Sequence, residues 1–197
     1  MKVRPVVSKK GFTLLEAIVA SSLLVVISAV MLSFLIQGAN LWQLMNDQSD
    51  LRSVGRIAMN YMTQELRKTT RDCEEDSSLN LTIPSKPKNT SVDFYLPVDS
   101  DTDNNDLIID DIGVTEWDKS NKIQYQYVPG LKRLRRLEKG NQYIIADDVK
   151  SIEFEDKSIN PDLYDNELKI ILTLQKLTAQ NRTASVTLTS IVKLRSR

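Results

Sequence analysis

The sequence predicts an α+β protein in which one long N-terminal helix packs on a C-terminal antiparallel sheet. Apolar residues recur at helical spacing through the first third of the chain. After about residue 73 they instead alternate with polar residues in short runs that end at Pro or Gly. Strands that follow a single helix and are joined by tight turns are typical of an antiparallel sheet. We therefore expect four consecutive segments, which are residues 1–11, 12–36, 37–72 and 73–197.

The first two segments are typical of a membrane anchor. Residues 1–11 contain four Lys or Arg residues and no acid, and from Ala17 to Ile36 there are 20 consecutive residues without a charge. As a helix, this run is about 30 Å long, which matches the hydrocarbon core of a bilayer. Because basic flanks stay in the cytoplasm, we expect a single-pass membrane protein whose C-terminal domain lies outside the cytoplasm.

Glu16 is a carboxylate near the start of this apolar segment. An unpaired carboxylate is unfavourable in lipid, and an ionisable residue there is a functional candidate by default. No basic residue follows it within one helical turn, so its partner is expected from another chain or from a new amino terminus created nearby. The residues after the run, with Gln37 among them, form a poor secretory signal-peptide site. The other small residue at a boundary is Gly11.

The run Lys9-Lys10-Gly11-Phe12-Thr13-Leu14-Leu15-Glu16 resembles the processing and methylation motif of type IV prepilins and of type II secretion pseudopilins. The resemblance implies that a prepilin peptidase cuts after Gly11 and methylates Phe12. It also implies that residues 12–36 insert in the bacterial inner membrane and later form the filament core. There, Glu16 meets the amino terminus of a neighbouring subunit. Because a buried ion pair is favourable only with close geometry, that pair acts as a register device.

The composition excludes several kinds of site. The chain has no His and one Cys, Cys73, so Ser-His-Asp triads, His-containing metal sites and intrachain disulfides are excluded. Its 26 basic and 26 acidic residues balance, which argues against direct nucleic-acid binding. Loss of residues 1–11 would leave 22 basic against 26 acidic residues, a net charge of −4. Carboxylate pairs lack a nucleophile or a phosphate-binding loop, so we expect no enzyme.

Residues 37–72 are expected to continue the helix as an amphipathic segment that enters the C-terminal domain. Its apolar stripe is Leu41, Leu44, Leu51, Val54, Ala58, Met62 and Leu66, widened by Ile57 and Tyr61. Nothing interrupts the pattern between the two segments. One helix is therefore predicted from about Phe12 to about Arg71, with a length of about 90 Å, and its second half is expected to pack on a sheet.

The C-terminal segment contains eight predicted strands and two predicted turns. Pro129-Gly130 predicts a type II turn, and Lys139-Gly140-Asn141 predicts another turn. The basic run 132–136 is expected to form a polar face of the sheet, with an acidic partner subunit or lipid head groups as the alternative. The predicted strands are residues 79–83, 92–96, 122–128, 131–138, 142–146, 148–155, 168–177 and 183–194.

This order of a strand, a Pro-Gly turn, a basic strand and two closing strands resembles the J-type minor pseudopilins of type II secretion, and also the W-type minor pilins. The J type implies a structural subunit that initiates pseudopilus assembly. Its implied partners are other minor and major pseudopilins, the prepilin peptidase, an assembly ATPase and the assembly platform in the membrane. The first alternative is a minor pilin of a type IV pilus or of a DNA-uptake system. Strand order and position in the filament stay open.

The acidic segment after residue 98 is a candidate calcium loop. Carboxylate and amide oxygens at alternating positions suit Ca²⁺, and these residues occupy positions 1, 3, 5, 7 and 12 of such a loop: Asp99, Asp101, Asp103, Asn105 and Asp110. Asn104 replaces the usual turn Gly, and the alternative is a solvated acidic loop. The second alternative function is therefore an uncut, membrane-anchored calcium-binding domain.

Overall fold

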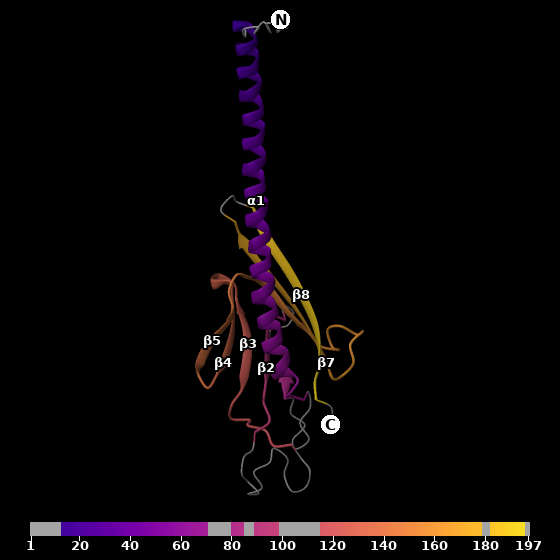
Figure 1. Ribbon diagram of the computed structural model, residues 1–197. Helices are drawn as coiled ribbons and strands as arrows, with labels where there is room; N and C mark the ends of the chain where they lie inside the picture. Colours follow the sequence, from indigo (N-terminus) through magenta and orange to yellow (C-terminus); the bar gives the residue numbers. More distant parts are fainter. Residues whose placement is uncertain (1–12, 71–79, 85–88, 99–114, 179–181, 196–197) are drawn as a thin grey trace, which may run out of the picture. The chain divides into compact units, whose positions relative to one another are not determined.

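The computed structural model describes residues 13–70, 80–84, 89–98, 115–178 and 182–195. It confirms the predicted α+β class, because one long helix and two antiparallel sheets make up the described chain (Figure 1). Each predicted strand run contains one observed strand, and the differences lie at the ends, where assignments vary most. The elements are α1 (Leu14–Leu66), β1 (Leu81–Thr82), β2 (Ser91–Phe94), β3 (Ile123–Val128), the 3₁₀ turn η1 (Pro129–Leu131), β4 (Arg133–Glu138), β5 (Asn141–Ala146), β6 (Val149–Glu155), β7 (Glu167–Leu177) and β8 (Thr183–Lys193).

The chain divides into two compact units, Met1–Gln43 and Leu44–Arg197. The described part of the first unit is the N-terminal portion of α1. The second unit contains the rest of α1 and both sheets.

Helix α1 ends at Leu66, earlier than the predicted Arg71. The last turn tightens, since the N–H of Lys68 donates to the carbonyl of Glu65 at 3.0 Å. Thr69 is then buried outside the helix, and its carbonyl accepts a hydrogen bond from the N–H of Arg195 at 3.0 Å. The helix therefore ends just before Thr69, whose carbonyl pairs with Arg195 near the end of the chain and not with the helix.

The first sheet has the order β1-β2-β3-β4-β5, and every neighbouring pair is antiparallel. It is a meander, because strands adjacent in sequence are adjacent in space. The stacked rings of Phe94 and Tyr125, with centroids 5.5 Å apart, join β2 to β3. The turn at Lys139 and Gly140 forms as predicted, with positive φ at both residues, and it connects β4 to β5.

The second sheet has the order β6-β7-β8, also antiparallel. Its inner face is apolar by strict alternation, and on β7 the buried residues are Leu168, Ile170, Leu172 and Leu174. Strand β6 bonds to the first sheet through the hydroxyl of Tyr127 on β3, which donates to the Lys150 carbonyl at 2.7 Å. The Phe154 N–H also donates to the carbonyl of Asn89, just before β2, at 2.9 Å. The two sheets thus share one hydrophobic core under α1.

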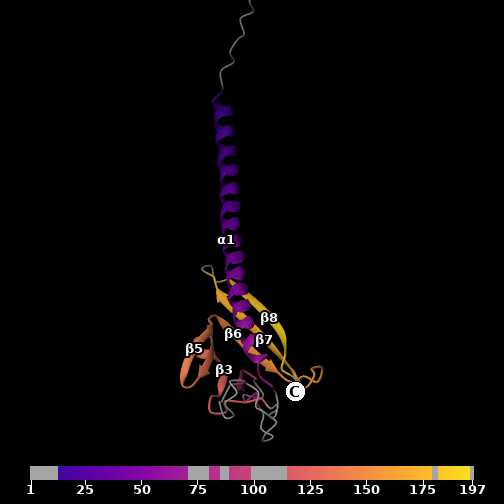
Figure 2. The ribbon, with the colours of Figure 1, turned by 60° about the horizontal axis from the view of Figure 1, so that its bottom comes forward.

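At Gly55, α1 approaches the second sheet closely. A Cβ placed on Gly55 would lie 2.5 Å from Cδ1 of Leu188 and 2.9 Å from Cδ1 of Leu174. The buried face of α1 is therefore centred on Gly55. It comprises Asp47, Leu51, Gly55, Ala58, Met59, Met62 and Leu66. In the second unit α1 lies between β5 on one side and β8 on the other (Figures 1 and 2).

The burial observed along α1 differs in part from the apolar stripe that the sequence predicts for this helix. Leu51, Ala58, Met62 and Leu66 are buried as expected, and Leu44 is partly buried against the core. Leu41 and Val54, which the predicted stripe also included, are 54% and 39% exposed. The expectation that Ile57 and Tyr61 widen the stripe is wrong, because Ile57 is 66% exposed and Tyr61 is 42% exposed. The sheet covers one side of the helix only, and these two residues point away from it.

The Pro129-Gly130 hairpin also differs from the predicted type II turn. The strand register leaves residues 129–132 as the loop, and η1 forms its first three residues. Lys132, rather than Gly130, adopts the left-handed conformation with φ 51°, and its N–H donates to the Pro129 carbonyl at 3.2 Å. Four-residue hairpin loops are most often built on a type I turn.

Candidate functional site

The apolar portion of α1 is the first candidate site. Every residue from Thr13 to Ala39 is exposed, and fifteen large apolar side chains lie exposed between Leu14 and Ile36. Burial of each contributes roughly 1.5 kcal/mol or more, so an apolar environment would favour this segment by on the order of 20 kcal/mol. Exposed apolar surface of this extent is typical of a membrane or protein contact.

The serines of this segment are compatible with an apolar environment. Ser21, Ser22 and Ser28 each donate a side-chain hydrogen bond to a carbonyl of the preceding turn, at distances of 2.9, 2.8 and 2.7 Å. A hydroxyl satisfied within its own helix costs little in lipid, because no donor is left without an acceptor. The serines therefore form no polar face, as their scattered spacing indicates.

Glu16 and Thr13 form a reciprocal pair at the start of α1. Oε2 of Glu16 accepts hydrogen bonds from the N–H and the Oγ1 of Thr13, at 3.0 and 3.1 Å. In return, the N–H of Glu16 donates to Oγ1 of Thr13 at 3.3 Å. This is a capping box, in which a Thr at the cap and a Glu three residues later satisfy the unpaired N–H groups of a helix start. The spacing in the sequence carried this signal, but our sequence analysis did not use it.

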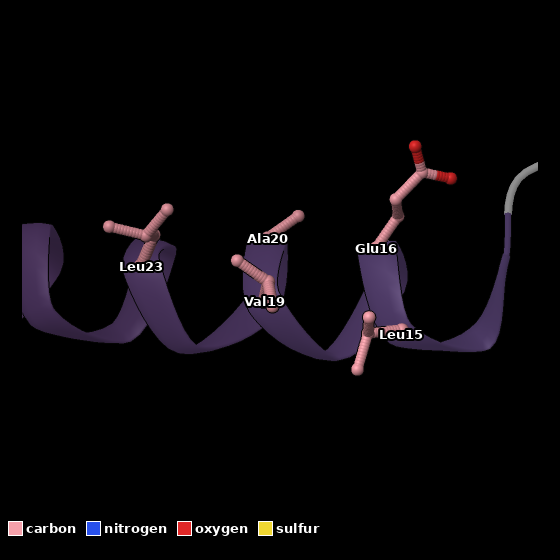
Figure 3. A pocket seen from close by; sticks show the side chains of 5 residues that line it. All are labelled: Leu15, Glu16, Val19, Ala20 and Leu23. Carbon is pink, nitrogen blue, oxygen red and sulfur yellow. The ribbon is translucent and has the colours of Figure 1, made fainter.

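A shallow hollow adjoins this carboxylate. It is lined by Leu15, Glu16, Val19, Ala20 and Leu23. Figure 3 shows the carboxylate of Glu16 projecting from the helix, with Ala20 and Leu23 along the same side one and two turns further on. Both hydrogen bonds from Thr13 fall on Oε2, and Oε1 has no partner in the described part of the chain. A cation approaching along this side would meet a carboxylate beside an apolar surface.

The other predicted site residues lie outside the described residues. Gly11 and Phe12 precede the first described residue. The five predicted calcium ligands lie between the described ranges that end at residue 98 and begin at residue 115: Asp99, Asp101, Asp103, Asn105 and Asp110. Cys73 also lies outside. Within the described ranges, no three Cys, Asp or Glu side chains are placed to hold a metal ion.

A second cluster of charged residues joins α1 to the first sheet. The buried Arg136 donates from Nε to Oε2 of Glu65 at 3.0 Å and from Nη1 to Oε2 of Glu138 at 2.6 Å. Its guanidinium also lies over the ring of Tyr143, 5.9 Å from the centroid. The hydroxyl of Tyr125 donates to the same oxygen of Glu65. No local pattern in the sequence predicts this cluster, because its members come from α1, β3, β4 and β5.

This cluster corrects the expectation for the basic run 132–136. Arg133 and Arg135 lie on the outer face, where they bond to Asp147 and Gln142 at 2.6 and 2.8 Å. Arg136 instead lies on the inner face, since side chains alternate along β4. The run is therefore not a single polar face of the sheet.

The surroundings of the cluster change the pKa values of its members. Burial raises the pKa of the Tyr125 phenol, and the hydrogen bond to Glu65 raises it further. Hydrogen bonds from Arg136 and Asn121 lower the pKa of Glu138. Tyr125 therefore stays neutral and Glu138 stays ionised at neutral pH, so neither group is suited to proton transfer near pH 7.

The described structure thus defines an α+β protein whose long helix includes a segment long and apolar enough to cross a membrane. No family model, curated protein or solved structure matches this chain.

Proposed function

We propose that the chain is a minor pseudopilin, a non-enzymatic subunit that initiates pseudopilus assembly in type II protein secretion. One observation carries the proposal. The exposed apolar part of α1 starts at Leu14, directly after the Gly11-Phe12 processing motif, and it carries a single carboxylate, Glu16, at its start.

The proposed pathway uses this segment twice. Residues 12–36 first anchor the chain in the bacterial inner membrane, with the basic residues 1–11 in the cytoplasm. Prepilin peptidase then cuts after Gly11 and methylates the new amino terminus at Phe12. The platform finally moves the same apolar segment from lipid into a bundle of subunit helices. A segment exposed on every side suits both environments, because each surrounds it with apolar groups.

Glu16 would set the register of the subunit in that bundle. Thr13 and Glu16 both remain after the cut, so the capping box survives processing. Oε1, which has no partner among the described residues, would accept the positive amino terminus of a neighbouring subunit. A subunit in the wrong register would bury the carboxylate without that partner, which is strongly unfavourable.

The second unit would present surfaces to other minor and major pseudopilins. The buried link between Glu65 and Arg136 supports a structural role, since it holds α1 on the first sheet. The proposed partners are those subunits, the prepilin peptidase and the assembly platform, and none is a nucleic acid.

Mass spectrometry of the chain purified from membranes tests the proposal. We expect a mature chain that begins at an N-methylated Phe12. An intact segment 1–11 would exclude the pilin class and favour the uncut calcium-binding anchor, which calorimetric titration with Ca²⁺ then tests. A methylated Phe12 is also expected for a minor pilin of a type IV pilus or DNA-uptake system. Deletion of the gene distinguishes the two systems. Loss of protein secretion would indicate a pseudopilin, and loss of pili would indicate a minor pilin.

A further inference from the structure

Strand β8 is an edge of its sheet that lacks the usual protection. Exposed edges are normally shortened, bulged, charged or covered, because their unpaired backbone groups attract other strands. The two edges of the first sheet are protected in this way. Strand β1 has only two residues, and the register of β5 with β4 shifts between Leu134 and Arg135. Strand β6 shifts register after Val149 and also bonds to the first sheet. Strand β8 has eleven residues in unbroken register, no Pro, and a single charge at Lys193.

The hydrogen bonds at the end of β8 show which of its backbone groups are free. The N–H of Leu194 donates toward β7, to the carbonyl of Asn166 at 2.8 Å. The next N–H, that of Arg195, points the other way and donates to Thr69. Because this direction alternates along an antiparallel strand, the odd-numbered residues direct N–H and C=O away from β7. Within the described chain, no other backbone group pairs with these outward N–H and C=O groups between Thr183 and Lys193. The residues that carry them are Thr183, Ser185, Thr187, Thr189, Ile191 and Lys193.

The flank of α1 above this edge is basic. Successive residues of a helix are about 100° apart, so Arg52 and Arg56 lie about 60° and 100° from Gly55 around the axis. Glu65 lies about 80° from Gly55 in the opposite direction, toward the first sheet, where it pairs with Arg136. Both arginines are exposed and form no ion pair within the described ranges. They line a shallow groove with Ser49, Ser53, Ile57 and Asn60.

The same charges disfavour a second copy of this chain as the occupant. A two-fold pairing of β8 with β8 would place the two helices on the same face of the joined sheet. Arg52 and Arg56 of both copies would then face one another, and like charges in contact are destabilising. A strand with carboxylates on its helix-facing side would meet these arginines favourably.

We propose that β8 is a docking edge for an extended acidic segment of a partner protein. The segment adds as a fourth strand beside β8, with backbone hydrogen bonds to the odd-numbered residues and with carboxylates directed at Arg52 and Arg56. Backbone pairing supplies affinity, and the side chains supply selectivity, as in other cases of strand addition. The inference rests on the second unit alone, so it holds whether or not the chain is a pseudopilin.

Fluorescence anisotropy with the full chain in detergent micelles tests this inference. The probe is a short labelled peptide that alternates Glu with Thr and Val, and its matched control carries Lys in place of Glu. We expect the acidic peptide to bind about tenfold tighter or more, a difference of about 1.4 kcal/mol. Equal binding of the two peptides would overturn the charge assignment.

Two pairs of variants test the edge and the flank separately. Thr187→Pro removes an outward N–H and leaves the bonds to β7, so it should weaken the acidic peptide about tenfold, whereas Thr187→Ala should not. Arg52→Glu with Arg56→Glu should abolish the preference for the acidic peptide, whereas Lys150→Glu on β6 should retain it. Circular dichroism checks that each variant is folded. Binding unchanged in both test variants, or a dimer of the wild-type chain that Thr187→Pro dissociates, would overturn the proposal.

Discussion

Arg136 and Glu65 are 71 residues apart in the chain, and their side chains form an ion pair with Nε 3.0 Å from Oε2. The two side chains are 7% and 14% exposed. The pair fastens the last turn of α1 to the inner face of β4. Because both charges are removed from water, the loss of either partner leaves an uncompensated charge in the core.

Arg136→Ala is therefore expected to destabilise the second unit by about 3–5 kcal/mol. The double change Glu65→Gln with Arg136→Met should cost clearly less, because it removes both charges and keeps apolar volume. Denaturant unfolding followed by near-ultraviolet circular dichroism measures both. A single variant no less stable than the double variant would contradict the account.

Gly55→Val tests the close approach of α1 to the second sheet. The new side chain would overlap Cδ1 of Leu188 and of Leu174, so we expect a loss of about 1–3 kcal/mol from overpacking. The control is Ser53→Val, which places the same side chain on the exposed side of the helix and should cost less than about 1 kcal/mol. Equal losses in the two variants would show that helix propensity, and not packing, limits position 55.

The stability of the second unit should fall at alkaline pH. Burial raises the pKa of Tyr125, and it also raises the pKa of Tyr61 and Tyr127. Above pH 10 the unfolded chain loses these phenolic protons while the folded chain keeps them, so stability is complete below pH 10 and decreases as the pH rises. Each group contributes a slope of at most about 1.4 kcal/mol per pH unit. Urea unfolding between pH 8 and 11 should show a smaller slope for Tyr125→Phe than for the wild type.

Glu16→Leu should leave processing largely intact and impair assembly. The cut requires the motif around Gly11 and Phe12, whereas the carboxylate is proposed to act only between subunits. The measurements are mass spectrometry of the amino terminus and the fraction of the chain recovered in sheared filaments. Val19→Leu, a change in the same hollow without loss of charge, is the control. Normal incorporation of Glu16→Leu would refute the register role.

Several features were readable from the sequence because their causes are local. The apolar run from Ala17 to Ile36 and the alternation in β7 each arise from neighbouring residues, so the helix and strands were predicted nearly where they form. The capping box of Thr13 and Glu16 is local too, and its spacing was available. The fold class follows from these patterns alone.

The candidate calcium loop and the processing site remain predictions, because Asp99 to Asp110 and the pair Gly11 and Phe12 lie outside the described residues. The inward position of Arg136 had no signal in the basic run, since its partner Glu65 is supplied by a distant helix. The free edge of β8 was equally hidden, because strand order depends on long-range pairing.

The sequence by itself determined the α+β class, the apolar start of α1 and the placement of one carboxylate, Glu16, within it. These follow from periodicity and charge over a few turns of chain. Only the tertiary structure decided which face of α1 is buried and which charges become internal. Ile57 and Tyr61 belong to the same predicted stripe as the residues that pack, but the sheet covers the face of α1 around Gly55, which has no side chain. Burial depends on that contact between distant segments, which local pattern does not specify.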